Sequence, residues 1–216
     1  MRTAEPTDRI RYIRELYCKE DNVLQKVDQT IQQYEQPIHI SPEDAKFLRV
    51  LLKLAGAKNG VELGSLAGYS TIWLARALPA DGKLYSIERS QNRYDMTKAS
   101  LEMSDVNNKV DLIFGDAEEK LKELSAHGPF DFIFIDANKS GYLNYLDWAD
   151  GNLKSGGLII ADNTMLFDEV YKEKPVKASK TAHQVMKDFN IRLANESKYE
   201  TIMLPTDDGM TISIKL

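Results

Sequence analysis

The sequence predicts an α/β fold: a doubly wound, mostly parallel sheet of seven strands with an antiparallel last strand, preceded by a helical N-terminal extension. From residue 61 onward, short apolar runs alternate with segments of helical periodicity. The most apolar run, residues 130–136, is typical of a central parallel strand covered on both faces. The last two strands, residues 200–204 and 210–215, flank Asp208-Gly209, a dipeptide typical of hairpin turns.

Length and composition favour a single domain over residues 1–216, with a helical extension at 1–36 and a core at 37–216. The formal net charge of −5 gives no general electrostatic reason to bind nucleic acid or an anionic membrane. The single Cys18 excludes an intrachain disulfide. No apolar run approaches 18 residues, so we expect no membrane partner and a cytoplasmic location.

Residues 1–36 predict two amphipathic helices, with Pro37 ending the second. Their apolar positions are Ile10, Ile13, Leu16, Tyr17, Val23, Leu24, Val27 and Ile31. Such stripes cannot form a core alone, so they should lie on the main domain or on a second subunit. Ser41 as N-cap and Pro42 at the first helical position then predict a helix that ends near Gly56.

The remaining elements are predicted as five strand–helix units and a final strand pair. The first five strands are expected at residues 61–63, 83–88, 110–114, 130–136 and 158–161, with a turn at 156–157. The first helix is expected at residues 71–78, and the second runs from the end of the second strand to about 103. The others are expected from 117 to about 124, from about 142 to 152, and around 182–190.

The whole sheet is organised around the turn after the first strand, where Gly64 and Gly68 stand four residues apart. Glycine allows positive φ and close approach of a ligand. In an alternating α/β chain this turn favours a nucleotide-like ligand, although packing alone also explains such glycines. The spacing is not the G-x-G-x-x-G fingerprint of dinucleotide-binding proteins. Glu88, 24 residues after Gly64, ends the second strand, where a carboxylate can accept bonds from ribose hydroxyls.

Two further strand ends carry oxygen ligands. Asp136 ends the fourth strand, and Asp162-Asn163 end the fifth. Carboxylate and amide oxygens suit Mg²⁺, although Asp162-Asn163 could equally form an Asx turn. Lys139 would lie in the same region and could act as a general base, or be an ordinary solvated loop lysine.

Three segments together resemble the cation-dependent S-adenosylmethionine O-methyltransferases, the family of catechol and caffeoyl-CoA O-methyltransferases and their bacterial relatives. The glycine turn at residues 62–70 resembles the first motif of that family. Residues 135–142 resemble its metal-and-base motif, and residues 156–163 its second metal motif. The resemblance covers roughly residues 35–216 and implies the class I, Rossmann-like methyltransferase fold.

The resemblance implies roles for individual residues. Lys139 would be the catalytic base, assisted by Asp136. Asp136, Asp162 and Asn163 would bind Mg²⁺, or another divalent cation such as Mn²⁺ or Ca²⁺. The residues that would contact S-adenosylmethionine are Ile40, Glu62, Gly64, Ser65, Ser70, Glu88, Asp116, Ala117 and Asp136.

The implied reaction is methyl transfer to a hydroxyl of a small catechol-like or phenylpropanoid-like acceptor, in a homodimer. The lysines of residues 171–180 could serve a phosphate-bearing or CoA-linked acceptor, or a hydroxylated uridine in tRNA. A nicotinamide-binding reductase or a non-catalytic nucleotide binder is the alternative from another class. The sequence leaves open the acceptor, the methylated position, the ion, and whether the N-terminal helices form a dimer contact or a lid.

Overall fold

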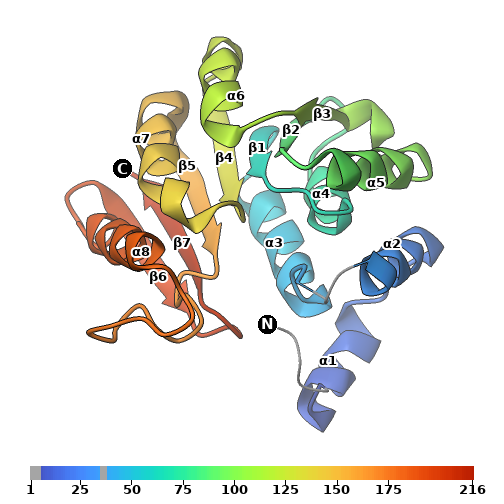
Figure 1. The fold of residues 1–216 in the computed structure, drawn as a ribbon. Coiled ribbons are helices and arrows are strands. Elements are labelled where there is room, and N and C mark those ends of the chain that lie inside the picture. The colour runs from blue at the N-terminus through green and yellow to red at the C-terminus, as the bar shows by residue number, and fades with distance from the viewer. Residues whose placement is uncertain (1–5, 35–37) are drawn as a thin grey trace. The chain divides into compact units, whose positions relative to one another are not determined.

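The computed structural model describes residues 6–34 and 38–216 (Figure 1). The predicted helix end at Pro37 and the boundary between 36 and 37 lie outside these residues. The α-helices are α1 (Asp8–Tyr17), α2 (Asn22–Tyr34), α3 (Pro42–Leu54), α4 (Tyr69–Ala75), α5 (Gln91–Glu102), α6 (Ala117–Leu124), α7 (Tyr142–Asn152) and α8 (Lys180–Leu193). The strands are β1 (Asn59–Leu63), β2 (Lys83–Glu88), β3 (Val110–Phe114), β4 (Phe130–Ile135), β5 (Leu153–Asp162), β6 (Tyr199–Leu204) and β7 (Met210–Lys215).

The strands form a seven-stranded sheet in the order β3-β2-β1-β4-β5-β7-β6. The pairs β2–β3, β1–β4 and β4–β5 are parallel, whereas β7 runs antiparallel to both β5 and β6. The predicted fold class is therefore confirmed. Within the described residues, no helix is long and apolar enough to cross a membrane.

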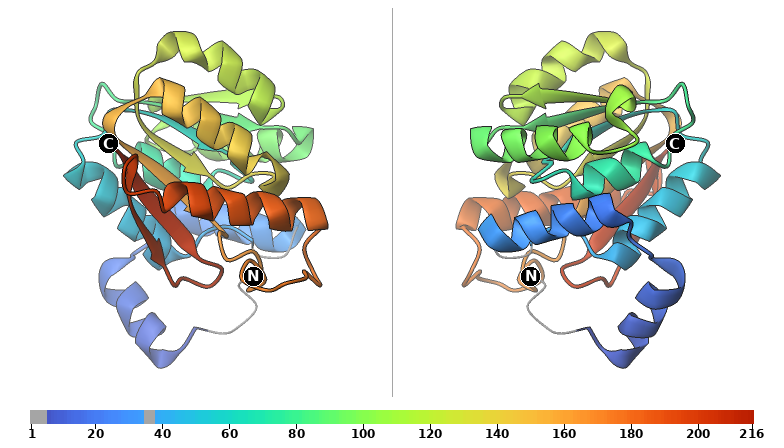
Figure 2. Two further views of the ribbon diagram at one scale, coloured as in Figure 1. Left: turned by 90° about the vertical axis from the view of Figure 1, so that its left-hand side faces the viewer. Right: turned by 90° about the vertical axis from the view of Figure 1, so that its right-hand side faces the viewer.

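The chain divides into two compact units, the first formed by Met1–Asn59 and Ser65–Phe114, and the second by Gly60–Gly64 and Gly115–Leu216. In the first unit, α3 packs against α1 and α4, and α2 packs against α4 (Figure 2). Helix α3 begins as predicted, because the Ser41 hydroxyl accepts a hydrogen bond from the Asp44 N–H at 3.0 Å.

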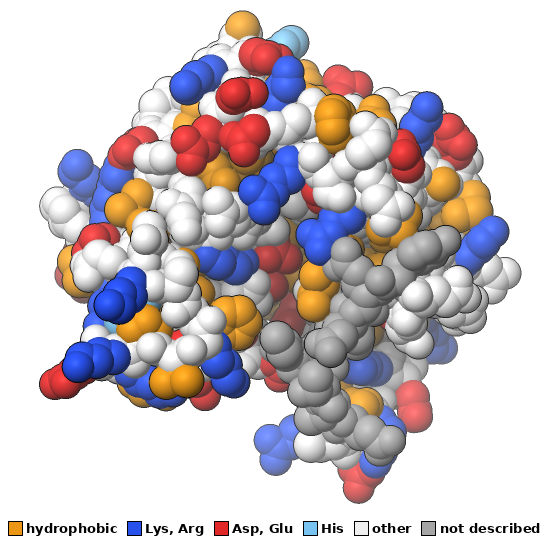
Figure 3. All heavy atoms as spheres, viewed as in Figure 1, with side chains coloured by type: hydrophobic (Ala, Val, Ile, Leu, Met, Phe, Trp, Pro, Cys, Tyr) orange, Lys and Arg blue, Asp and Glu red, His pale blue; other side chains and the backbone are white. Residues whose placement is uncertain are grey.

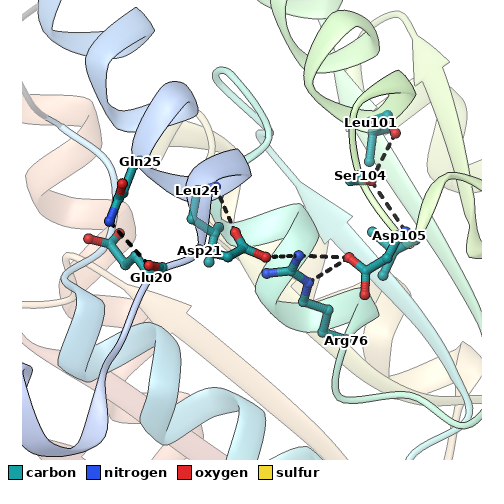
Figure 4. A network of polar contacts seen from close by, with 9 residues as sticks. Glu20, Asp21, Leu24, Gln25, Arg76, Leu101, Ser104 and Asp105 are labelled. Carbon is teal, nitrogen blue, oxygen red and sulfur yellow. Dashed lines mark hydrogen bonds and ion pairs between the residues drawn. The ribbon is translucent and has the colours of Figure 1, made fainter.

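Helix α2 belongs to the core of the first unit. Leu24, Val27 and Ile31 are fully buried, one helical turn apart. At the start of α2, Asp21 forms an ion pair with Arg76, which also pairs with Asp105 at 2.7 Å (Figure 4). No residue of α1, in contrast, is buried.

In the second unit, β4 is the central strand and five of its six residues are fully buried apolar side chains: Phe130, Phe132, Ile133, Phe134 and Ile135. Its neighbour β5 is equally apolar over Ile159–Ala161. Helix α7 packs against α6, α8 and both strands. The continuous hydrophobic run predicted a central strand because both of its faces are covered.

The bounds of two elements, α4 and β5, differ from the predicted ones for identifiable reasons. Helix α4 starts two residues before 71, since the Gly68 carbonyl already accepts from the Ile72 N–H at 3.0 Å. It ends at Ala75, where the bonds shorten to three-residue spacing before Pro79. Strand β5 includes the glycines expected as a turn at 156–157, because they lie where its pairing with β4 shifts register.

Candidate functional site

The second unit brings together the acidic residues at the ends of β4 and β5. The parallel register pairs Ile135 with Ala161, so Asp136 and Asp162 are the next residues along neighbouring strands. The Asp136 backbone N–H donates to the Leu63 carbonyl at 3.0 Å, which fixes the chain where it leaves β4. Both carboxylates lie in partly exposed positions. The predicted convergence of these two acids is therefore present.

Lys139 and Tyr142 connect the two strand ends. Lys139 Nζ donates to Asp136 Oδ1 at 3.0 Å and to Tyr142 Oη at 2.8 Å. Tyr142 Oη in turn lies 2.9 Å from the Asp162 carbonyl oxygen and 3.2 Å from the Ile135 carbonyl oxygen. The Tyr142 ring is fully buried and packs edge-on against Phe189 of α8. One phenol thus holds the lysine against the ends of β4 and β5.

The electrostatics of this cluster favour a charged lysine beside a neutral phenol. Burial lowers the pKa of Lys139, but the Tyr142 oxygen and the carboxylates of Asp136 and Asp162 outweigh that effect and raise it above its ordinary value. Burial also raises the pKa of Tyr142, so its hydroxyl stays protonated. The Lys139 side chain keeps 19% of its surface exposed.

The donor set at these strand ends fits a hard divalent cation. Asp136 and Asp162 offer carboxylate oxygens, and Asn163 adds an amide oxygen directly after Asp162. Among residues 6–34 and 38–216, no three His, Cys, Asp or Glu side chains gather in a way that could hold a metal. A bound ion would therefore need the amide and water or acceptor oxygens besides the two acids.

Asn163 also has a purely conformational explanation. Its backbone is left-handed, with φ of 57°, and asparagine adopts that conformation more readily than most residues. Its N–H donates to Asp162 Oδ1 at 2.8 Å, a bond between adjacent residues, whereas an Asx turn would use the N–H two residues after Asp162, which donates to the Gly209 carbonyl instead.

The end of β1 lies directly beside the end of β4 in the second unit. Gly64 has φ of 89°, and a Cβ at this position would come within 2.2 Å of the Asp136 carbonyl oxygen. Only glycine fits this contact without displacing Asp136. Packing alone therefore accounts for this glycine of the predicted ligand-binding turn.

In the first unit, Glu88 is buried and organises the backbone of the glycine turn. Its carboxylate accepts from the N–H groups of Ser65 and Leu66, both at 3.2 Å, and from Ser90 at 2.9 Å. The Ser65 hydroxyl is 2.8 Å from Thr97 Oγ1. The carboxylate predicted to bind ribose thus also supports the turn at the start of the sheet.

The other residues predicted to contact a cofactor differ in exposure. Ile40 and Ser70 are buried in the first unit, and Glu62 is fully buried in the second. Asp116 is an exposed N-cap of α6 that accepts from the Glu118 N–H at 2.9 Å, which is the ordinary structural role of such a residue. Ala117 is the first residue of that helix and is buried.

Sequence reasoning gave no role to Glu169, which holds the segment that follows Asn163. Its buried carboxylate accepts from the N–H groups of Val176, Lys177 and Ala178 at 2.9–3.1 Å. These bonds hold the pKa of Glu169 below its ordinary value, against the opposing effect of burial. Four exposed lysines occur on or beside this segment: Lys172, Lys174, Lys177 and Lys180. Figure 3 shows basic side chains at the lower left of the molecule.

Tyr142 was also without an assigned role, although it lies within the recognised motif at residues 135–142. The spacing of Tyr142 could have indicated its contact with Lys139. Tyr142 stands three residues after Lys139 at the start of a helix, which places both side chains on one side of the chain.

Comparison with known proteins identifies related chains over nearly the full length. A family model described as O-methyltransferase matches residues 14–216. A catechol O-methyltransferase of Niastella koreensis is 36% identical and covers 94% of each chain. A caffeoyl-CoA O-methyltransferase of Medicago sativa is also 36% identical, over 80% of this chain and 72% of its own. The O-methyltransferase TomG from Streptomyces achromogenes, solved in complex with SAM, superposes with a TM-score of 0.87 at 31% identity over 94% of each chain.

Proposed function

The chain belongs to the O-methyltransferase family, and from this membership we propose that it transfers a methyl group from S-adenosylmethionine to a hydroxyl of a small phenolic acceptor, with the help of a divalent cation. The observation that carries the proposal is the cluster at the ends of β4 and β5. There the Lys139 amine bonds to the Asp136 carboxylate, and Tyr142 connects this pair to the backbone of Asp162, which Asn163 follows directly.

Asp136, Asp162 and Asn163 would hold the cation, preferably Mg²⁺ or Mn²⁺. A bound divalent ion would lower the pKa of a neighbouring acceptor hydroxyl and offset the charge of the two carboxylates. Lys139 Nζ, once it has lost its own proton to solvent, would accept the hydroxyl proton, and the resulting oxyanion would attack the methyl carbon of the sulfonium. The S–CH₃ bond breaks and leaves a neutral thioether. Tyr142 keeps Lys139 oriented throughout this step.

The residues that would contact S-adenosylmethionine in this proposal are the ones that the family resemblance implies: Ile40, Glu62, Gly64, Ser65, Ser70, Glu88, Asp116, Ala117 and Asp136. The methyl donor is supported by the related TomG structure, which contains SAM.

We infer that the acceptor carries two neighbouring oxygens on an aromatic ring, as in catechol. The relatives named for catechol and for caffeoyl-CoA support this class. The four exposed lysines between β5 and the start of α8 favour an acceptor with a negatively charged extension. The chain as a whole has a net charge of −5, so these lysines are a local departure from its acidic character. Family membership disfavours the nicotinamide-binding alternative.

The test measures transfer of labelled methyl groups from S-adenosylmethionine to catechol, caffeoyl-CoA or bulk tRNA, with Mg²⁺ or with EDTA. We expect activity on a phenolic acceptor that EDTA abolishes. Asp136→Ala and Asp162→Ala should each lose at least about a hundredfold in kcat, since a Lewis acid supplies several kcal/mol. Exposed Asp207→Ala is the matched control. Full activity of either variant in EDTA would refute the cation role, and methylation of tRNA alone would refute the acceptor.

Homodimer formation and a cytoplasmic location stay predictions. Helix α1 supports the first, because it is amphipathic yet leaves Tyr12, Leu16 and Tyr17 exposed.

A further inference from the structure

The segment that follows the strand end at Asp162 contains an unusual backbone conformation. Leu166, Phe167 and Asp168 have φ of 51°, 59° and 61°, one complete left-handed turn made without glycine. Left-handed L-residues normally occur singly, because Cβ approaches the following carbonyl oxygen. Surrounding contacts must therefore hold this turn in place.

The turn between β6 and β7 provides those contacts. Asp208 is buried, and its carboxylate accepts from the Phe167 N–H at 2.6 Å. Its backbone carbonyl accepts from the Met165 N–H at 2.8 Å, and the Gly209 carbonyl accepts from the Thr164 N–H at 3.0 Å. Three successive bonds thus tie the segment to the hairpin.

The same turn is connected directly to Asn163. The Leu166 N–H donates to the Asn163 carbonyl at 3.0 Å, so the left-handed turn closes on this residue. In the sheet, Asp162 pairs with Met210, two residues after Asp208. The hairpin therefore fixes the chain on both sides of the Asp162-Asn163 dipeptide.

We propose that Asp208 is a positioning residue for cation binding: by holding the left-handed turn at Leu166–Asp168, its carboxylate fixes Asn163 beside Asp162. This inference rests on the proposed function, because it takes Asp162 and Asn163 as ligands. The bond accounts for a buried carboxylate that the methyl-transfer step itself does not use.

The test is calorimetric titration of the full-length protein with Mn²⁺ alone, together with S-adenosylhomocysteine binding and thermal unfolding. Asp208→Asn should weaken Mn²⁺ binding by roughly tenfold or more, the usual effect of losing a residue that orients a ligand. S-adenosylhomocysteine affinity should stay within about twofold. Asp207→Asn, the exposed neighbour with the same charge change, is the control.

A second substitution separates positioning from charge or packing. Asp168 is exposed, and Asp168→Gly removes the conformational cost at one of the three left-handed residues. The double variant D208N/D168G should recover a measurable part of the Mn²⁺ affinity, at least about threefold over D208N, even though it carries one negative charge fewer than D208N. If D208N does not fold, G209A replaces it, because a Cβ there would come within 3.0 Å of the Met165 backbone nitrogen and displace the segment.

The outcomes distinguish this inference from the proposed function. Wild-type Mn²⁺ binding with unchanged affinity in D208N overturns the role of Asp208 alone. Loss of affinity without recovery in D208N/D168G also overturns it, since Asp208 would then act by charge or packing. Absence of Mn²⁺ binding by the wild type refutes the cation site and this inference together.

Discussion

Lys139 is the residue whose protonation most directly controls the proposed chemistry. In the structure its pKa is raised by Tyr142 and by the carboxylates of Asp136 and Asp162, despite its burial. A general base must lose its proton before each turnover. Activity should therefore increase as pH rises and a larger fraction of Lys139 becomes neutral.

Replacement of this lysine gives a direct prediction. Lys139→Met keeps a long apolar chain but removes the amine, so kcat should fall by about 10²–10⁴, the usual contribution of a general base. The affinity for S-adenosylmethionine, measured by calorimetry, should be unchanged. Exposed Lys172→Met is the control for loss of a positive charge. Near-normal kcat in K139M would show that another group accepts the proton.

Tyr142→Phe tests the phenol that holds Lys139 in place. The variant loses the 2.8 Å bond from Lys139 and the donor to a strand carbonyl. We expect a loss in the free energy of unfolding of about 2–4 kcal/mol, the sum for one ordinary hydrogen bond and one from a charged group, measured by urea denaturation. Because Lys139 also becomes less well oriented, kcat should fall by about tenfold. Tyr171→Phe, at an exposed position, should change neither quantity.

At this scale the sequence predicted the residues but not their connections. Asp136, Lys139 and Asp162 could be found because acids and a lysine after apolar strands are costly unless they have a purpose. The junction at Tyr142 Oη could not, since it depends on how α7 packs against α8 through Phe189. For Asp116 the family resemblance implied a contact with the cofactor. In the structure its carboxylate caps helix α6, which is an ordinary structural role.

Among the elements, the segment between β5 and α8 depends on one carboxylate. Glu169 has a pKa below its ordinary value of 4.5, so its charged form stabilises the folded segment. This stabilisation is complete above pH 4.5 and is lost as pH falls through the lowered pKa. Hydrogen-exchange protection of the Val176, Lys177 and Ala178 amides should therefore decrease as the pH is lowered from about 7 to about 3.

Glu169→Gln provides the comparison. The neutral amide is a weaker acceptor, so protection of these three amides should be lower at neutral pH and should vary little with pH. Glu173→Gln, an exposed neighbour, should behave as the wild type. Protection in the wild type that does not change over this pH range would contradict the role of Glu169.

The sequence predicted the elements themselves better than their ends. Apolar runs located every strand, whereas the glycines at 156–157 were taken for a turn because a bulge inside β5 depends on its partner β4. The left-handed turn at Leu166–Asp168 contains no glycine, so nothing in its composition indicated it.

For the whole molecule, the mostly parallel seven-stranded sheet with its antiparallel last strand followed from the alternation of patterns along the chain. The order of the strands within the sheet was not predicted from the sequence. The function of the N-terminal helices did not follow, because an amphipathic stripe indicates that a face is covered without identifying what covers it. The structure separates the two helices: α2 buries Leu24, Val27 and Ile31, whereas α1 buries nothing.

The last prediction therefore concerns α1 and the association of two chains. Tyr12 and Tyr17 are 64% and 62% exposed, and Leu16 is 49% exposed, which leaves a large apolar surface in water. If this surface forms the dimer contact, the wild type should have twice the chain mass of 24.5 kDa by light scattering. Leu16→Asp with Tyr17→Asp should give the monomer mass with unchanged thermal stability, because neither side chain belongs to the core.

The control is Ile191→Asp, at another exposed apolar position, which should leave the dimer intact. A dimer that persists in the double variant would mean that another surface joins the chains, and lost activity in that dimer would favour a lid.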